Sequence, residues 1–314
     1  MRIVPYQALR ENAAWINLSG RGYIRVGDED RARLLHAMTT NHVQQLQPGQ
    51  GCYAFFLNAT GRILGDSHIL CADDAFLLDT EPETHGKIAQ HIERYVIADA
   101  VTVEDLSDKV SVLAVEGPAA DAIALRMGID KPPAAGNWTT WNAWQVAAIS
   151  VTGLPGFRFY GPRLEESQMI GWFAGMGLVE AGRPEWDPVR IENARPRYGD
   201  DISEQQIPHE TQLLHAIHFS KGCYLGQEIV ERVRSRGHVN RKLVQLKVEG
   251  KQAPAAKTKL TADGKEVGEI TTAAYSPAND CVMALGYVRV EHGKPGSKLD
   301  AGGASAEVTD RAPA

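Results

Sequence analysis

The sequence lacks several features that would assign a protein to a class at once, and cysteine is the clearest case. It occurs only four times in 314 residues, as Cys52, Cys71, Cys223 and Cys281, without any C-x-x-C pair. Disulfide frameworks, structural zinc sites and self-contained iron–sulfur clusters all need clustered ligands. We therefore expect a chain from a reducing compartment that holds no metal site of its own.

Long apolar runs are also missing. No stretch approaches the ~18 apolar residues that a membrane span requires, and residues 1–6 do not form the apolar segment of a secretory signal. These absences predict a cytoplasmic protein without a membrane-bound segment. The formal net charge of −6 excludes a surface that is basic throughout and coats nucleic acid.

One local basic cluster lies late in the chain, and two interpretations of it stay open. It could bind a protein or RNA partner, or it could be a solvated helix end whose cations favour the helix dipole. The cluster consists of Arg232, Arg234, Arg236, His238, Arg241 and Lys242.

The length and an apolar content of 43% indicate two or three domains. The first part of the chain reads β-α-β-β-β-α-β, with Asp28 as the expected cap of the first helix. The expected strands are 23–26, 51–57, 62–70, 76–78 and 100–103, and the expected helices follow Asp28 and cover 83–96.

The same order recurs in the second part. Strands are expected at 111–115, 144–151, 157–160 and 178–180, and helices at 119–127 and 164–175. Two tandem split βαβ units, ferredoxin-like in order, predict an α+β protein with helices on one face of each antiparallel sheet. From Lys242 onward, short alternating runs predict a small β-barrel. We expect domains at residues 1–108, 109–240 and 241–314.

The segment Lys221–Glu228, with the sequence KGCYLGQE, carries the clearest chemical signal. It places Cys223 between two glycines, beside Lys221 and just before a helix expected after Gly226. An adjacent cation and a helix N-terminus both favour a thiolate. The pattern therefore predicts a reactive thiol, with Tyr224 shielding one side of it. The alternative is an inert cysteine in a turn that enters a helix.

This octapeptide resembles the signature of the YgfZ family, folate-binding proteins related to the T-protein, the aminomethyltransferase of the glycine cleavage system. Residues 195–202 and 207–210 are similar to the T-protein segment upstream of its Lys-Gly motif, and residues 40–41 and 57–66 to its folate-side strands. The resemblance spans about residues 23–290. It implies a T-protein-like fold, two α+β lobes and a β-barrel around a folate channel, with tetrahydrofolate as cofactor.

A pterin site needs an aromatic face, a group that reads the ring edge, and cations near the tail. Trp186, Arg190 and Glu192 offer these types close together, and Trp186 and Arg190 share a helix face at spacing four. The resemblance implies that Trp186 and Arg190 contact folate. We expect Glu192, Asn58 and Tyr224 to belong to the same site.

The resemblance also implies a role for Asp66, since the T-protein acid at this place assists attack at the folate nitrogens. The chain departs from the T-protein pattern at residues 152–157, where T-proteins carry a longer loop with an acidic pair. Pro155 stands in this stretch and cannot supply that carboxylate, which argues against glycine cleavage activity.

The sequence therefore supports two alternative functions. In the first, the protein binds tetrahydrofolate and supports iron–sulfur cluster assembly or repair, and through cluster enzymes tRNA modification. Cys223 is then its reactive centre, with Lys221 beside it, and iron–sulfur enzymes or assembly proteins are its partners. The alternative is a folate-dependent aminomethyl- or methyltransferase of one-carbon metabolism, with Asp66 as acid/base and Cys223 incidental.

Overall fold

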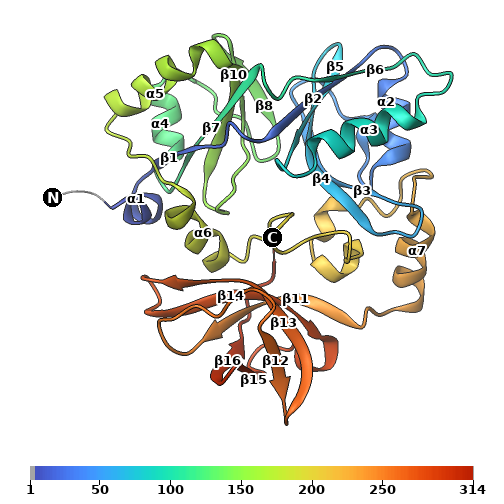
Figure 1. The fold of residues 1–314 in the computed structure, drawn as a ribbon. Coiled ribbons are helices and arrows are strands. Elements are labelled where there is room, and N and C mark those ends of the chain that lie inside the picture. Colours follow the sequence, from blue (N-terminus) through green and yellow to red (C-terminus); the bar gives the residue numbers. More distant parts are fainter. Residues whose placement is uncertain (1–3, 314) are drawn as a thin grey trace. The chain divides into compact units, whose positions relative to one another are not determined.

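The computed structural model describes residues 4–313, which divide into two compact units. The first unit comprises the chain up to residue 150 together with 154–182 and 215–227. The second comprises 151–153, 183–214 and the chain from 228 on. Each unit is described by itself below, with the element labels of Figure 1.

The first sheet of the first unit is five-stranded and antiparallel, in the order β3-β4-β5-β2-β6. Its helices α2 (Arg31–Met38) and α3 (His85–Tyr95) bury Leu35, Ile88 and Ile92 against it. These strands and helices are drawn in blue and cyan in Figure 1. The strands are β2 (Gly22–Gly27), β3 (Gly51–Leu57), β4 (Ile63–Cys71), β5 (Ala75–Thr80) and β6 (Thr102–Asp105).

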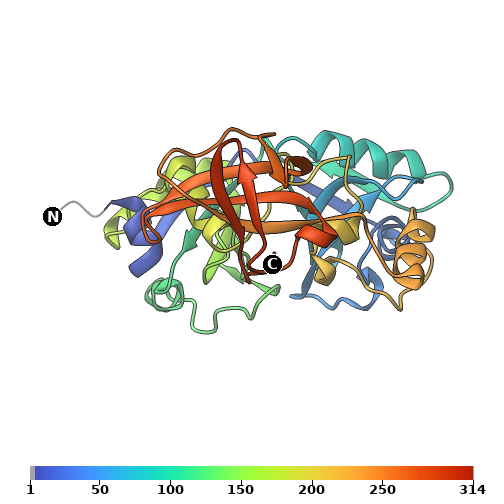
Figure 2. The same ribbon diagram turned by 90° about the horizontal axis from the view of Figure 1, so that it is seen from below.

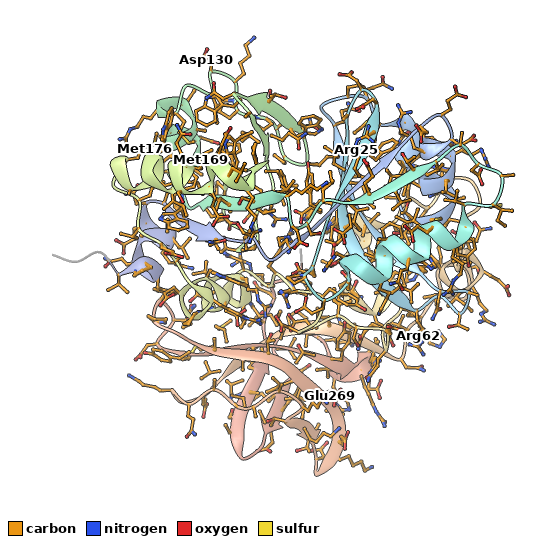
Figure 3. The ribbon with its side chains drawn as sticks, turned by 45° about the horizontal axis from the view of Figure 1, so that its top comes forward. Arg25, Arg62, Asp130, Met169, Met176 and Glu269 are labelled. Atoms are coloured by element: carbon orange, nitrogen blue, oxygen red, sulfur yellow. The ribbon has the colours of Figure 1, made fainter. Side chains whose placement is uncertain are left out.

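The second sheet of this unit is also five-stranded and antiparallel, in the order β1-β7-β10-β9-β8. Met169 of α5 is buried in its core and Met176, just beyond α5, packs against that core; both are labelled in Figure 3. The strands are β1 (Ala14–Asn17), β7 (Val110–Glu116), β8 (Trp138–Trp141), β9 (Trp144–Ala147) and β10 (Gly156–Pro162). The helices are α1 (Pro5–Glu11), α4 (Ala120–Arg126) and α5 (Glu166–Gly175).

A buried ionic cluster joins the two sheets of the first unit. Asp79 of β5 is fully buried and accepts hydrogen bonds from Arg21, from Arg158 of β10 and, at 2.6 Å, from the Tyr160 hydroxyl. Burial alone would raise the pKa of Asp79, but the two guanidinium groups outweigh burial and hold this pKa well below its usual range. The cluster therefore fixes the position of one sheet relative to the other.

The second unit is built on a closed six-stranded barrel in the order β11-β14-β13-β12-β15-β16. Its strands are drawn in orange and red, and Figure 2 shows how they wrap around one another. Helix α6 (Arg183–Glu192) packs Ile191 against Leu243 and Leu285 of the barrel. The strands are β11 (Arg241–Val248), β12 (Lys259–Ala262), β13 (Lys265–Ser276), β14 (Cys281–Arg289), β15 (Lys298–Ala301) and β16 (Ala304–Val308).

Helix α7 (Gln227–Arg236) begins within the octapeptide, directly after Gly226, as expected. Short 3-10 turns complete the described secondary structure, at Val43–Gln45, Arg163–Glu165, Pro208–Thr211, Leu214–Ala216 and Val290–His292. Within residues 4–313, no helix combines the length and the apolar character needed to cross a membrane.

The predicted α+β class with a C-terminal barrel is confirmed, while several local expectations need correction. The residue before α2 is Asp30, whereas Asp28 has a φ of 72° in the turn ahead of it. Residues 178–180 form no strand, since Glu180 makes only a single bridge to Trp15. Strands β1 and β8 were not expected, because each is short and owes its strand form to pairing with β7 or β9. The domain boundaries after residues 108 and 240 remain predictions.

Candidate functional site

The Lys221 side chain anchors the octapeptide to the end of α2. Its ammonium donates to the carbonyl oxygens of His36 at 2.5 Å, Thr39 at 2.6 Å and Asn41 at 2.8 Å. The nitrogen also lies 4.9 Å from the centre of the Tyr224 ring. An ammonium has three N–H donors, so these three carbonyls satisfy it completely. Lys221 therefore anchors the loop on the N-terminal side of Cys223.

Histidines gather around this ammonium. Burial lowers the pKa of His36 to about 4, with further lowering by Lys221, His42 and His218. The rings of His36 and His42 are 4.5 Å apart between centres, and those of His42 and His218 are 5.0 Å apart. Burial lowers the pKa of Lys221 to about 7, while Cys52 raises it. The three carbonyl acceptors also favour the ammonium, so Lys221 rather than His36 carries the charge here.

Gly226 allows the octapeptide to lie in close contact with the β3–β4 turn. A Cβ at this position would lie 2.6 Å from the Asn58 carbonyl oxygen and 2.9 Å from the Leu57 Cβ, and φ is +81°. Only glycine accommodates both the close approach and this backbone conformation without strain. Beside it, the Leu225 amide donates to the Ala37 carbonyl at 2.9 Å. The loop is thus held on two sides, by α2 and by the hairpin.

Asn58 closes the turn of that hairpin. Its side-chain oxygen accepts from the backbone amides of Thr60 at 2.9 Å and Arg62 at 3.0 Å, and from the Thr60 hydroxyl at 2.7 Å. Asn58 therefore shapes the surface on which the octapeptide rests. Its predicted contact with folate remains a prediction.

Asp66 lies on β4 of the same hairpin and is 6% exposed. The Tyr53 hydroxyl of β3 donates to its carboxylate at 2.6 Å. Tyr53 in turn packs against His215, with ring centres 5.6 Å apart. The Asn41 amide donates both to the Tyr53 carbonyl at 2.8 Å and to the His215 carbonyl at 3.0 Å. Asp66 is thus oriented by a side chain that packs against the segment leading into the octapeptide.

Cys223 is exposed, whereas the other three cysteines are buried or half-buried. Burial raises the pKa of Cys52 to about 12 and also raises the pKa of Cys71 and of Cys281. Cys223 therefore has the accessible thiol of this chain. Its predicted role as a nucleophile remains a prediction.

The residues expected around the pterin on α6 lie in the second unit. Trp186 is 8% exposed, and the Arg183 guanidinium lies 5.8 Å from the centre of its ring. Glu192 is 4% exposed, and its backbone carbonyl accepts from the Gln245 amide at 3.0 Å. Both residues are therefore largely buried in the second unit.

Arg190 is occupied within the protein. It is 1% exposed, and its guanidinium pairs with Asp187, with Asp201 at 2.6 Å and with Asp200 at 3.5 Å. Burial would lower the pKa of Arg190, but these carboxylates raise it above its usual value. A folate contact by Arg190 would have to compete with these partners. In this structure Arg190 ties α6 to residues 200–201.

Sequence reasoning missed the surroundings of Lys221. His36 and His42 were not singled out. The sequence did contain a signal for His42, because this residue directly follows Thr40–Asn41, the pair that is similar to the folate-side strands of T-proteins. Across residues 4–313, no group of three or more His, Cys, Asp or Glu side chains is arranged to hold a metal ion.

The fold consists of two antiparallel α+β sheets and a C-terminal six-stranded barrel, and the site contains a Lys-Gly loop fixed against one hairpin. These features together define a class of protein. Residues 5–221 match the GCVT N-terminal domain, and residues 241–311 match the glycine cleavage T-protein C-terminal barrel domain. The chain therefore belongs to the glycine cleavage T-protein (GCVT) family, and the expected aminomethyltransferase-like relationship is confirmed.

Similar proteins agree with this family. A chloroplastic protein of Arabidopsis thaliana named "Putative transferase At1g60990" is 25% identical over 91% of this chain and 68% of its own length. An aminomethyltransferase of Koribacter versatilis is 29% identical over 90% of this chain and 78% of its own. The crystal structure of aminomethyltransferase T from Bartonella henselae covers 98% of this chain and 87% of its own, with a TM-score of 0.88 and 21% identity, which shows a common fold.

Proposed function

We propose that this protein binds tetrahydrofolate and acts on a one-carbon unit, as a transferase of an aminomethyl or methyl group. The observation that carries the proposal is the close approach of Gly226, just beyond the matched residues 5–221, to the β3–β4 hairpin of the matched GCVT domain. The octapeptide, which carries Lys221 and Cys223, thus contacts through Gly226 the hairpin that holds Asn58 and Asp66.

The residue types suit a pterin. Trp186 offers a ring face for stacking, and Glu192 offers a carboxylate that can read the pterin edge. Asn58 and Tyr224 are further candidates for contact. Bound tetrahydrofolate would carry the one-carbon unit on its nitrogens N5 and N10. Asp66, oriented by the Tyr53 hydroxyl, would then take or give a proton at one of these nitrogens.

The named relatives support transfer chemistry, because the curated proteins described above carry the names of an aminomethyltransferase and a transferase. Glycine cleavage itself is a poor fit to residues 152–157. This stretch is a short connection into β10, and the Pro155 carbonyl accepts from the Gly117 amide at 2.9 Å. The acidic pair of the T-protein loop has no counterpart in it. We therefore place the substrate among other small amines or methylated compounds.

A second candidate function follows from Cys223. An exposed thiol on a loop fixed by three hydrogen bonds of Lys221 has no place in aminomethyl transfer. It suits a YgfZ-like protein that supports iron–sulfur cluster assembly or repair and, through cluster enzymes, tRNA modification. One thiol cannot hold a cluster alone, so a client enzyme or assembly protein would supply the remaining ligands.

Two variants distinguish the candidates. Asp66→Asn removes the acid, Cys223→Ala removes the thiol, and Ser220→Ala alters an exposed neighbour as the matched control. Purified proteins are assayed for tetrahydrofolate-dependent turnover of dimethylglycine, with an aminomethyl-lipoyl carrier, the substrate of glycine cleavage, as the comparison. The same variants are expressed at matched levels in a strain that lacks its own family member and has low iron–sulfur enzyme activity.

Transferase function predicts turnover that is lost in Asp66→Asn and kept in Cys223→Ala. The second candidate predicts no turnover and a rescue of the strain that is lost in Cys223→Ala. Turnover that survives Asp66→Asn, or rescue by all three variants, would contradict the roles given to these residues.

A further inference from the structure

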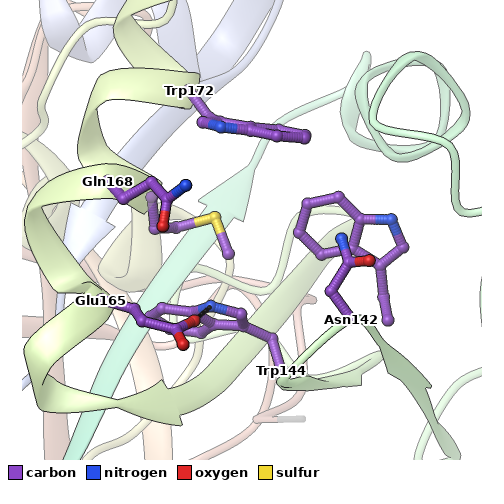
Figure 4. A pocket seen from close by; sticks show the side chains of 7 residues that line it. Asn142, Trp144, Glu165, Gln168 and Trp172 are labelled. Carbon is purple, nitrogen blue, oxygen red and sulfur yellow. Dashed lines mark hydrogen bonds between the residues drawn. The ribbon is translucent and has the colours of Figure 1, made fainter.

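A separate pocket lies in the second sheet of the first unit, where the β8–β9 hairpin meets α5. It has a volume of about 150 Å³ and is lined by Trp141, Trp144, Trp172, Asn142, Glu165, Gln168 and Met169. Figure 4 shows the Trp172 ring on one side and the Trp144 ring on the opposite side, with Glu165 beside Trp144. None of these residues takes part in the site described above.

The fold holds the Trp144 ring firmly. A Cβ on Gly161 of β10 would come within 2.2 Å of this indole, so glycine is required for the ring to lie against the strand. Trp144 is 3% exposed, and its indole N–H donates to the Glu165 carboxylate at 3.3 Å. This hydrogen bond fixes the carboxylate at the edge of the ring.

The other two rings form the walls. Trp172 of α5 is 43% exposed, although a helix surface normally keeps so large an apolar ring from water. Trp141 meets it edge to face, with ring centres 5.2 Å apart and planes at 75°. The exposed ring face of Trp172 and the carboxylate of Glu165 are both negative, and both residues line the pocket.

The chemistry of the lining favours one class of ligand. Indole faces attract cations, and no basic side chain lines the pocket. A primary ammonium would need several hydrogen-bond acceptors to replace its water, while a methylated ammonium gives up little hydration and uses ring faces directly. We propose that Trp141, Trp144, Trp172 and Glu165 form a binding site for a methylated ammonium group carried by a small molecule.

The test uses the full chain with a 15N label on its indole groups. Tetramethylammonium and choline are titrated while the indole N–H signals of Trp144 and Trp172 are followed. Ethanolamine serves as the primary ammonium, and 3,3-dimethyl-1-butanol as the neutral molecule with the shape of choline. A peptide with trimethyl-lysine tests whether the same group is instead read on a protein.

Saturable binding of choline is expected, at least tenfold tighter than that of the neutral analogue or ethanolamine. Trp172→Ala should weaken it about tenfold, on the scale of one cation–π contact, and Trp172→Phe should restore most of it. Glu165→Gln should weaken choline binding severalfold without affecting the neutral analogue. Leu164→Ala, a fully exposed neighbour, and Glu180→Gln, an exposed carboxylate, are the controls and should change nothing.

Equal binding of choline and its neutral analogue would overturn the proposal in favour of a plain apolar pocket. The absence of saturable shifts with either cation would also overturn it. Tighter binding of the peptide than of choline would assign the site to a modified protein instead of a small molecule.

Discussion

Replacing Gly226 by alanine tests the contact on which the candidate site depends. The new Cβ would lie 2.6 Å from the Asn58 carbonyl oxygen and 2.9 Å from the Leu57 Cβ. Both are parts of the hairpin that cannot simply rotate away. The octapeptide must therefore shift, and the backbone strain of a φ of +81° adds to this cost.

Gly237 supplies a matched control at the other end of α7. Its φ is +92°, and a Cβ there would meet nothing within 4 Å. Gly237→Ala should therefore show the conformational cost alone, about 1 kcal/mol. Gly226→Ala should add a steric cost typical of overpacking, about 1–3 kcal/mol more.

Urea unfolding of both variants measures this difference, and hydrogen exchange at the Leu225 amide reports it locally. That amide donates to the Ala37 carbonyl, so it should lose protection in Gly226→Ala and keep it in Gly237→Ala. Equal destabilisation by the two substitutions, with Leu225 protected in both, would refute the argument that Gly226 seats the loop.

Three further predictions concern single side chains. Cys223 should be the first cysteine alkylated in a competition read by mass spectrometry across pH, because it is exposed while burial raises the pKa of Cys52 to about 12; earlier labelling of Cys52 would show the reverse. His36 has a pKa of about 4 in the folded protein and ~6.5 when unfolded, so the unfolded chain binds more protons between these values. Stability should therefore fall by up to about 3 kcal/mol as the pH drops from 6.5 to 4, and His36→Gln should flatten that part of the stability profile; an unchanged profile would contradict this. Asp79→Asn leaves Arg158 without its buried counter-charge and should cost about 3–5 kcal/mol in urea unfolding, so a loss below 1 kcal/mol would count against the ionic cluster.

The sequence predicts best where structure depends on neighbouring residues. The start of α7 follows from Gly226, and β3 and β4 follow from apolar runs on either side of the Asn58 turn. Strand β1 depends instead on β7, which lies almost a hundred residues further along the chain. No local pattern predicts such pairing, so β1 was not expected.

The candidate site, like the fold, could be predicted from the sequence only where it depends on neighbouring residues. The octapeptide is visible in the sequence because its residue types are unusual at that spacing. The three carbonyls that hold Lys221 are backbone atoms at the end of α2, and any residue types could have supplied them. The aromatic pocket was also hidden, because Trp141 and Trp172 come together only through the packing of β8 on α5.

Calorimetric titration of the full chain with tetrahydrofolate tests the central claim most directly. We predict saturable binding at one site. Trp186→Ala should weaken it by about 1–2 kcal/mol, the scale of aromatic stacking, whereas Trp172→Ala should leave it unchanged. An absence of saturable heat, or equal affinity in Trp186→Ala and the unaltered protein, would contradict the account.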